Sequence, residues 1–329
     1  MPIGDSRLRP FRYGLVGAGR MGRTHLRALE GSDVVAVTAV AEPDEQGRAA
    51  VADRYGLAAF AALEVMLESD AIDGILVATP TDSHVDVIAA AVAVGVPVLC
   101  EKPCGRDPLD ARRALELASA TGVPVQVAYW RRYVPVLQEL RKQIASGGVG
   151  NVLTLVCTQW DGEPPPPAFR LTSGGIFIDM GVHEFDQARW LLDSDLATLG
   201  AVGTAPTATA PRVPGALQPD LDGAQLVGQT TSGVPVAVSL GRYYQGGDMV
   251  RVEVFGTDEH VVHDVLTPDD GEAVQLLALE RQACAFADFV AGGPCTGATI
   301  DDAVAALEIA SSAQALLPPQ GAPAEVTLA

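Results

Sequence analysis

The segment DMGVH at 179–183 contains two residues that together could perform acid–base chemistry. Asp179 and His183 are four residues apart, so on a helix they lie on the same face. Imidazole titrates near neutral pH, and a carboxylate one turn away can orient it as a proton acceptor. A surface Asp–His pair, or an aspartate that caps a helix, would have the same spacing. The nearby Glu184 and Asp186 are expected to be solvated or structural.

A lysine stands in a constrained setting in EKPCG at 101–105. Lys102 follows an apolar, strand-like run and precedes Pro103, which restricts the direction in which the chain continues. A lysine aimed into a cleft benefits from that restriction, and its ammonium group could stabilise negative charge on a reacting oxygen. A solvated surface lysine remains the alternative.

The segment YGLVGAGRMG at 13–22 has the glycine spacing of a dinucleotide site. The first glycine suits a tight turn, the second removes a side chain that would meet phosphate, and the third lets a helix pack closely on its strand. A glycine-rich turn without a ligand is the alternative. The predicted cofactor contacts in this segment are Gly17, Gly19, Arg20, Met21 and Gly22.

An acidic residue follows at the distance that such a site requires. Glu42 lies twenty residues beyond Gly22, directly after the β-branched run 34–41. A carboxylate there can accept hydrogen bonds from the ribose hydroxyls and would repel a 2′-phosphate. No arginine directly follows Glu42, so NAD is favoured over NADP. A solvated loop carboxylate is the alternative.

Strand-like and helix-like patterns alternate through the first half of the chain, which predicts a doubly wound parallel sheet. We expect strands at 34–41, 74–78, 96–100 and 125–128, and helices at 20–29, 44–55, 62–68, 84–94 and 109–120. Ligands bind such sheets beyond the carboxyl ends of the strands. We therefore assign residues 1–128 to an NAD-binding Rossmann domain.

One loop at a predicted strand end is TPTDSH at 79–84. Thr79 and Pro80 are expected to line the nicotinamide side of the cofactor, and Ser83 is expected to cap the following helix. His84 faces either the cleft or solvent. The remaining predicted cofactor contacts are Thr79, Pro80, His84, Glu101 and Lys102.

The pattern changes in the second half to longer strands without helices between them. Strands are expected at 152–160, 225–231, 235–244, 250–255 and 260–266, with helices at 133–146, from about 179, at 276–291 and at 300–317. This predicts an α+β domain at 129–329 with a large, mostly antiparallel sheet and, at 204–219, a loop rich in Pro, Ala and Thr. The last helix could pack on either domain. A sheet face without helices needs cover, which predicts a homo-oligomer.

Composition excludes several partners. The chain of 329 residues has a net charge of −19, which disfavours nucleic acid and anionic membranes, and 48% hydrophobic residues, ample for packed cores. We expect no signal peptide, membrane span or metal site. The five scattered cysteines suit reduced thiols, hence a cytoplasmic location.

With these segments in order, the chain resembles the Gfo/Idh/MocA oxidoreductase family over nearly its whole length. The resemblance rests on GAGRMG at 17–22, EKP at 101–103 and DMGVH at 179–183. Arg132, DGEPPPP at 161–167 and SGGIFIDMGVHEFD at 173–186 look most like the inositol 2-dehydrogenase branch.

The resemblance implies that Lys102, Asp179 and His183 form the catalytic set. The implied reaction is reversible oxidation of a secondary ring alcohol of a cyclic polyol or sugar to a ketone, with hydride transfer to NAD, in a dimer or tetramer assembled through the open sheet. Predicted substrate contacts are Lys102, Trp130, Arg132, Asp161, Asp179, His183 and Tyr244.

Two departures from the branch bear on the substrate. A tyrosine is expected where QGGD stands at 245–248, with Tyr243 and Tyr244 just upstream, and Trp130 replaces a smaller residue. Both leave the reaction class intact and put myo-inositol in doubt in favour of a pyranose, an anhydrosugar or another inositol. A non-catalytic dinucleotide-binding sensor and a biosynthetic keto-sugar reductase are the alternative functions.

Overall fold

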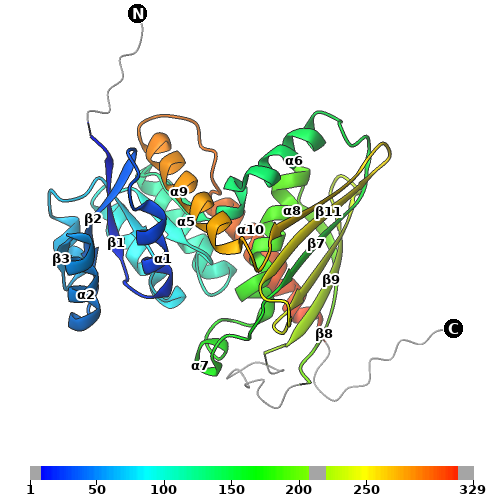
Figure 1. The fold of residues 1–329 in the computed structure, drawn as a ribbon, viewed down its shortest axis with the longest axis horizontal. Coiled ribbons are helices and arrows are strands. Elements are labelled where there is room, and N and C mark those ends of the chain that lie inside the picture. Colours follow the sequence, from blue (N-terminus) through cyan, green and yellow to red (C-terminus); the bar gives the residue numbers. More distant parts are fainter. Residues whose placement is uncertain (1–8, 207–219, 318–329) are drawn as a thin grey trace, which may run out of the picture. The chain divides into compact units, whose positions relative to one another are not determined.

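The protein is described by a computed structural model that covers residues 9–206 and 220–317 and forms two compact units (Figure 1). The first unit consists of residues 9–105, Leu109–Tyr133 and Gln275–Val304, and the second of the other described residues. The boundary expected after residue 128 stays a prediction, and most of the loop expected at 204–219 lies outside the described residues.

The first unit is built on a six-stranded sheet with the order β3-β2-β1-β4-β5-β6, and every pairing in it is parallel. The strands are β1 (Phe11–Val16), β2 (Val35–Ala41), β3 (Ala58–Phe60), β4 (Gly74–Val77), β5 (Val98–Glu101) and β6 (Val125–Ala128). The strand order reverses between β1 and β4, where doubly wound sheets bind ligands. The predicted sheet is confirmed, although the short β3 was not predicted.

Helices cover both faces of this sheet. They are α1 (Arg20–Leu29), α2 (Glu45–Tyr55), α3 (Leu63–Leu67), α4 (His84–Ala93), α5 (Pro108–Thr121) and, from far along the chain, α9 (Gly271–Val290). One core joins Tyr13 and Leu15 of β1 to Leu26 of α1, Val51 of α2 and Phe286 of α9.

The neighbouring β1 residue Gly14 points to the other face, because successive residues of a strand face opposite sides. A Cβ on Gly14 would lie 2.9 Å from the Met66 side chain of α3, which therefore covers that face. On the first face, the Tyr13 hydroxyl donates to the Ala283 carbonyl at 2.8 Å and anchors α9.

The second unit is built on a six-stranded sheet with the order β12-β11-β7-β10-β9-β8. The strands are β7 (Val152–Trp160), β8 (Leu196–Thr204), β9 (Gly223–Thr230), β10 (Pro235–Gly241), β11 (Met249–Gly256) and β12 (His260–Leu266). Only the pairing of β7 with β10 is parallel among these described strands, so the mostly antiparallel sheet is confirmed.

Two strand predictions in this unit were wrong. The edge strand β8, LATLGAVGT, was missed because two glycines and two alanines weaken its strand pattern. Strand β10 ends at Gly241 instead of Tyr244. The Arg242 N–H still donates to the Asp222 carbonyl beside β9 at 2.9 Å, but the Tyr244 N–H turns to the Asp161 carbonyl beyond the end of β7, also at 2.9 Å.

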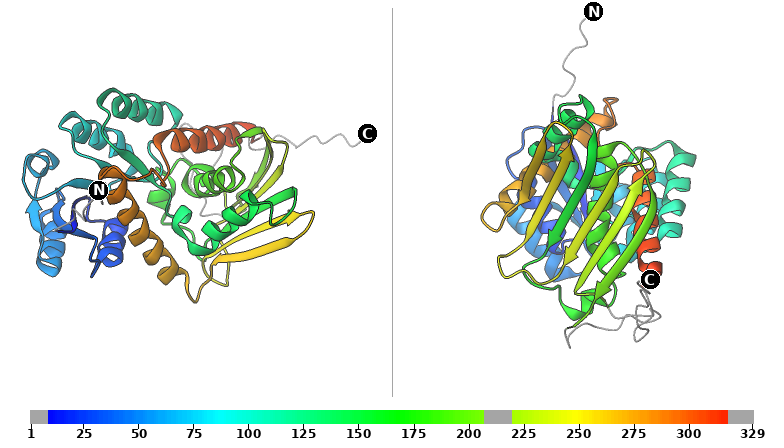
Figure 2. Two further views of the ribbon diagram at one scale, coloured as in Figure 1. Left: turned by 90° about the horizontal axis from the view of Figure 1, so that it is seen from above. Right: turned by 90° about the vertical axis from the view of Figure 1, so that its right-hand side faces the viewer.

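The helices of this unit are α6 (Pro135–Ala145), α7 (Pro167–Arg170), α8 (Val182–Leu192) and most of α10 (Ile300–Leu316). Helix α8 packs on β7, and the inward residues of the sheet are buried. The right-hand view of Figure 2 faces the other side of this sheet, where no described helix covers the strands. Val202 and Val227 on that side are 63% and 61% exposed. The expected open sheet face is therefore present.

Candidate functional site

The glycine turn follows β1 and opens α1. Gly17 has φ of +93°, and a Cβ there would lie 2.8 Å from the Ala78 carbonyl oxygen; a Cβ on Gly22 would lie 2.2 Å from the Gly17 oxygen. Both positions therefore require glycine for the fold itself. A Cβ on Gly19 would meet no described atom within 4 Å. The turn is thus open at Gly19, at the N-terminus of a ten-residue helix, which fits the pyrophosphate of a dinucleotide.

Glu42 lies against this turn. One carboxylate oxygen accepts the Ala18 N–H at 2.8 Å, and the other accepts the Asp44 N–H at 3.0 Å. The side chain therefore bridges the end of β2 to the glycine turn and is not a purely solvated loop carboxylate. This is the position from which a carboxylate can reach the ribose hydroxyls of a dinucleotide held by the turn.

His84 is buried and ties two loops together. Its Nδ1 lies 2.8 Å from the Pro103 carbonyl oxygen and its Nε2 lies 3.0 Å from the Thr79 carbonyl oxygen. Burial lowers the pKa of His84, while the two carbonyl contacts act in the opposite direction. The expectation that His84 faces solvent was wrong, because its side chain is buried and both ring nitrogens lie near backbone carbonyls. The alternative that it faces the cleft stays a prediction. Its contact with a cofactor stays a prediction.

Ser83 does not cap α4, contrary to expectation. It belongs to the 3-10 turn Thr81–Ser83, and its hydroxyl bonds to the Thr79 hydroxyl at 2.7 Å and the Pro80 carbonyl at 2.8 Å. Capping requires an extended backbone at the residue before the helix, whereas the preceding 3-10 turn gives Ser83 φ and ψ of −100° and −9°.

Glu101 is buried at the end of β5 and is held by a residue that the sequence analysis missed. Its Oε1 lies 2.6 Å from His25 Nε2, and its Oε2 accepts the backbone N–H of Lys102 at 3.2 Å. The peptide bond between Lys102 and Pro103 is cis. A signal for His25 existed, because it falls on the apolar stripe of α1 formed by Gly22, Leu26 and Leu29.

Trp130 and Arg132 lie in a buried 3-10 turn, Trp130–Tyr133, after β6. The Arg131 guanidinium stands 5.8 Å from the Trp130 ring centroid. Arg132 pairs with Asp302 in the first turn of α10, with 3.2 Å between Nη2 and Oδ2. Their predicted contacts with substrate stay predictions.

Asp179 and His183 lie on consecutive turns of one continuous helical segment. Asp179 belongs to a π-helical turn, Phe177–Gly181, which runs into α8. The helix therefore begins earlier than expected, and the Asp179 N–H already donates to the Gly175 carbonyl. His183 is buried and the Asp179 side chain is 12% exposed, so the alternative of a surface pair is wrong. Glu184 and Asp186 are also buried instead of solvated.

A buried charged cluster that no sequence pattern indicated lies beside Asp179. Arg242 Nη1 lies 3.0 Å from Asp179 Oδ2, and the other side of the same guanidinium meets Asp220 at 3.1 Å. Arg170 bonds to Asp220 at 2.6 Å and to Asp222 at 2.9 Å. No local pattern marks these residues, because the side-chain contacts that join them span 22 to 63 positions along the chain.

Asp161 lies at the end of β7 in the same unit. Its N–H donates to the Gly241 carbonyl and its own carbonyl accepts the Tyr244 N–H, both at 2.9 Å. Burial raises the pKa of Asp161 to about 6, with the negative charges of Asp179 and Asp248 acting in the same direction. Asp161 therefore lies close enough to Asp179 and Arg242 to sense their charges, and a backbone hydrogen bond joins it to Tyr244.

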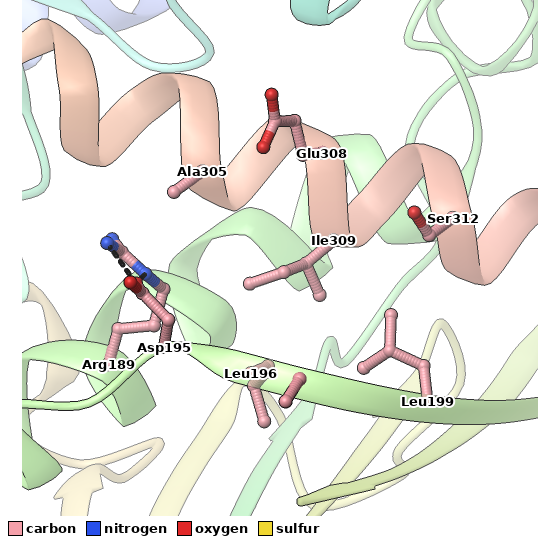
Figure 3. A pocket seen from close by; sticks show the side chains of 9 residues that line it. Arg189, Asp195, Leu196, Leu199, Ala305, Glu308, Ile309 and Ser312 are labelled. Atoms are coloured by element: carbon pink, nitrogen blue, oxygen red, sulfur yellow. Dashed lines mark hydrogen bonds and ion pairs between the residues drawn. The ribbon is translucent and has the colours of Figure 1, made fainter. Parts of the chain in front are cut away.

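The predicted residues are divided between the two units. Lys102, Trp130 and Arg132 belong to the first unit with all the predicted cofactor contacts; Asp161, Asp179, His183 and Tyr244 belong to the second. A pocket of about 230 Å³ in the second unit, between β8 and α10, holds none of these residues (Figure 3). It is lined by Arg189, Asp195, Leu196, Ala197, Leu199, Ala305, Glu308, Ile309 and Ser312.

Comparison with known proteins identifies the family. Residues 11–129 match the model of an oxidoreductase family with an NAD-binding Rossmann fold, and residues 137–262 match the GFO/IDH/MocA C-terminal domain. The chain belongs to the Gfo/Idh/MocA family of oxidoreductases, which confirms the predicted resemblance.

Individual relatives agree with this assignment. The rhizopine catabolism protein MocA of Rhizobium meliloti is 45% identical over 307 residues, covering 93% of this chain and 95% of the relative. An inositol 2-dehydrogenase of Rhizobium meliloti strain 1021 is 33% identical, covering 75% and 73%. The crystal structure of a putative myo-inositol dehydrogenase from Sinorhizobium meliloti 1021 superposes with a TM-score of 0.85 at 28% identity, covering 93% and 97%.

These findings confirm that the protein is an enzyme, an oxidoreductase of the dehydrogenase type with an NAD-binding Rossmann domain. In the part of the chain that the structure describes, no helix is long and apolar enough to cross a membrane. All five cysteines are free thiols.

Proposed function

We propose that the protein oxidises a secondary ring hydroxyl of a cyclic polyol or sugar to a ketone in a reversible, NAD-dependent reaction. The observation that carries the proposal is the placement of Asp179 and the buried His183 four residues apart on one helical segment of a chain that is 33% identical to an inositol 2-dehydrogenase. An imidazole with a carboxylate four residues away on the same helix suits the removal of a hydroxyl proton.

The roles follow from what the reaction requires. NAD, when bound, accepts the hydride from the carbinol carbon. The hydroxyl proton goes to His183, because a neutral imidazole can accept a proton, and Asp179 orients His183 and binds a neighbouring substrate hydroxyl. The Lys102 ammonium hydrogen-bonds to the reacting oxygen and stabilises its partial negative charge. Trp130, Arg132, Asp161 and Tyr244 recognise the rest of the ring.

We favour NAD over NADP because of Glu42. Its carboxylate already bonds to the amide of Ala18 in the glycine turn, so a 2′-phosphate on the ribose would approach a negative charge. The predicted contacts at Gly17, Gly19, Arg20, Met21 and Gly22 serve the pyrophosphate, and those at Thr79, Pro80, His84, Glu101 and Lys102 serve the nicotinamide end.

The substrate class extends beyond myo-inositol. The segment 245–248, QGGD, is exposed or half-buried beside Tyr244, and it provides no tyrosine to contact a ring hydroxyl. We therefore propose inositol isomers, pyranoses and anhydrosugars as the substrates to test. A keto-sugar reductase acting on nucleotide sugars would need cationic groups for a diphosphate, and the described cluster around Asp179 has net negative charge.

We also propose that the protein is a cytoplasmic homo-oligomer assembled through the open face of the second sheet. Val202, Val227 and Val262 lie on that face, where an Arg251–Asp264 ion pair at 2.6 Å accompanies them. Exposed apolar side chains on a sheet surface favour self-association. Replacing Val227 with Arg should lower the molar mass measured by light scattering, and an unchanged mass would contradict this interface.

The central experiment measures formation of reduced cofactor at 340 nm with NAD or NADP and a panel of inositols, aldoses and anhydrosugars. We expect turnover with at least one cyclic polyol and a preference for NAD. A protein that binds NAD but turns over none of the panel would contradict the proposed dehydrogenase and favour the dinucleotide-binding sensor.

A further inference from the structure

Arg242 stands directly after β10 and contacts the predicted catalytic carboxylate from inside the protein. Its side chain is 0% exposed, and its Nη1 lies 3.0 Å from Asp179 Oδ2. The mechanism proposed above gives Arg242 no role. This contact ties the helix that carries Asp179 and His183 to a charged residue that directly follows a strand of the sheet.

We propose that Arg242 is a positioning residue, which holds Asp179 in the orientation that the reaction needs. This inference rests on the proposed function. Arg242 acts through Asp179, which in turn orients His183, and it does not itself contact substrate or cofactor.

The guanidinium of Arg242 is fixed on both of its sides. Its Nε lies 3.1 Å from Asp220 Oδ2, and its Nη2 donates to Asp220 Oδ1 at 3.3 Å. Its Nε also points at the Leu221 carbonyl at 3.2 Å. A planar guanidinium bound to one carboxylate along one edge has a fixed direction for its remaining donors. Nη1 is that remaining donor, and it is directed at Asp179.

Asp220 is in turn held by a second buried arginine. Arg170 Nε donates to Asp220 Oδ2 at 2.6 Å and Arg170 Nη2 donates to Asp222 Oδ1 at 2.9 Å. Arg170, Asp220 and Asp222 are all buried. Buried charges are tolerated only when paired and hydrogen-bonded, so these contacts form a rigid support for Arg242.

The charges of the cluster show which member faces the candidate site. Arg170 and Arg242 carry two positive charges, and Asp220 and Asp222 carry two negative charges that balance them. Asp179 adds a third carboxylate, and its side chain is the most exposed of the five at 12%. A structural cluster is complete without Asp179. The contact with Asp179 therefore links the cluster to the predicted catalytic carboxylate.

Arg170 provides a matched control. It has the same charge, it is equally buried and it shares Asp220 with Arg242, but within the described part of the chain its bonds run to Asp220, Asp222 and the Leu221 carbonyl instead of Asp179. A purely structural cluster predicts similar consequences for Arg170→Lys and Arg242→Lys. Positioning of Asp179 predicts that only Arg242→Lys changes catalysis.

The experiment measures kcat, KM, NAD affinity and melting temperature for both variants, with NAD and the best polyol of the panel. For Arg242→Lys we expect kcat to fall about 10- to 100-fold, the cost of a misplaced catalytic group, with NAD affinity unchanged. For Arg170→Lys we expect kcat within about threefold of wild type. Equal losses of kcat in the two variants, or no loss in Arg242→Lys, would overturn the inference.

A double-mutant cycle tests the route through Asp179. In an Asp179→Asn background, Arg242→Lys should cause no further loss of kcat, because both changes remove the same effect. Losses that multiply would show that Arg242 acts independently and would overturn the inference. If Arg242→Lys does not fold, Asp220→Asn replaces it and Asp222→Asn becomes its control, with the larger loss of kcat expected in Asp220→Asn; equal losses would again overturn it.

A readout independent of turnover separates this inference from the proposed function. The side-chain ¹⁵N signal of His183, assigned by its loss in His183→Gln, should shift in Arg242→Lys and stay in place in Arg170→Lys. If the wild type oxidises no polyol, the proposed function fails while this signal still decides the role of Arg242. An unmoved His183 signal in Arg242→Lys overturns the positioning role.

Discussion

The two units position their candidate functional groups by different means. In the first unit, backbone atoms do most of the positioning: carbonyls hold His84, and the glycine turn offers its amides to Glu42. In the second unit, charged side chains do it, since Asp179 is held by Arg242 and Arg242 by Asp220. The glycine turn is a local backbone shape, whereas the orientation of Asp179 depends on side chains that are distant in the sequence.

The largest expected effects come from the predicted catalytic residues, one from each unit. Lys102→Ala and His183→Ala should each lower kcat by about 10²- to 10⁴-fold, the range for loss of a positioned acid–base or electrostatic group. NAD affinity, measured by fluorescence titration, should stay near that of wild type. Wild-type turnover in either variant would remove that residue from the mechanism.

The glycine turn provides a matched pair that separates fold from cofactor binding. Gly22→Ala places a methyl group 2.2 Å from the Gly17 oxygen and should destabilise the protein by about 3 kcal/mol. Gly19→Ala meets no described atom within 4 Å, so stability should hold while NAD affinity falls by about tenfold. Urea unfolding and NAD titration of both variants check this. Unchanged NAD affinity in Gly19→Ala would mean that the pyrophosphate lies elsewhere.

Glu42 tests whether the first unit also sets cofactor choice. Glu42→Ala should reduce the preference for NAD over NADP by about tenfold, the value of one charge-assisted hydrogen bond. The control is Asp44→Asn, which keeps an acceptor for the Gly47 N–H at the start of α2. The ratio of kcat/KM for the two cofactors decides. A wild-type enzyme that works better with NADP would refute our interpretation of Glu42.

The smallest expected effect concerns Asp161 in the second unit. Its folded pKa is raised to about 6, so the folded protein binds more protons than the unfolded chain between about pH 4 and pH 6. The contribution of Asp161 to stability is therefore present at low pH and is lost as pH rises through this window. As pH rises from 4 to 6, the melting temperature of Asp161→Asn should fall less than that of wild type.

The exposed Asp269→Asn serves as the control for that measurement and should keep the wild-type dependence on pH. If Asp161→Asn also shows the wild-type dependence of stability on pH, then burial of the Asp161 carboxyl does not influence stability. Other buried carboxylates of the second unit would then account for the pH dependence of its stability.

Much of the first unit could be predicted because its signals are local. Strand β2 is a continuous run of alanines, threonine and valines, and α1 begins directly after the glycine turn, so period and turn chemistry sufficed. Errors arose where a neighbour in space decided the outcome. His84 follows a loop that looks exposed, but the Pro103 carbonyl, nineteen residues further on, draws its ring into the core.

The second unit was less predictable for the same reason. The spacing of Asp179 and His183 indicated a shared helical face, and it could not indicate burial or the π-helical turn that carries Asp179. Arg242 was placed inside a strand, since the apolar alternation before it gives no reason to stop at Gly241. Its partners Asp220 and Asp222 follow a Pro-rich segment that gives no pattern at all.

By itself, the sequence determined the Rossmann sheet, the glycine turn with Glu42 and the identity of Lys102, Asp179 and His183 as candidates, because each depends on residue types at short separations. Only the tertiary structure decided which charged residues support them. His25 beneath Glu101 and Arg242 beside Asp179 are joined to their partners across 76 and 63 residues. Buried polar contacts of this kind form when folding brings the two groups together, and no spacing along the chain records them.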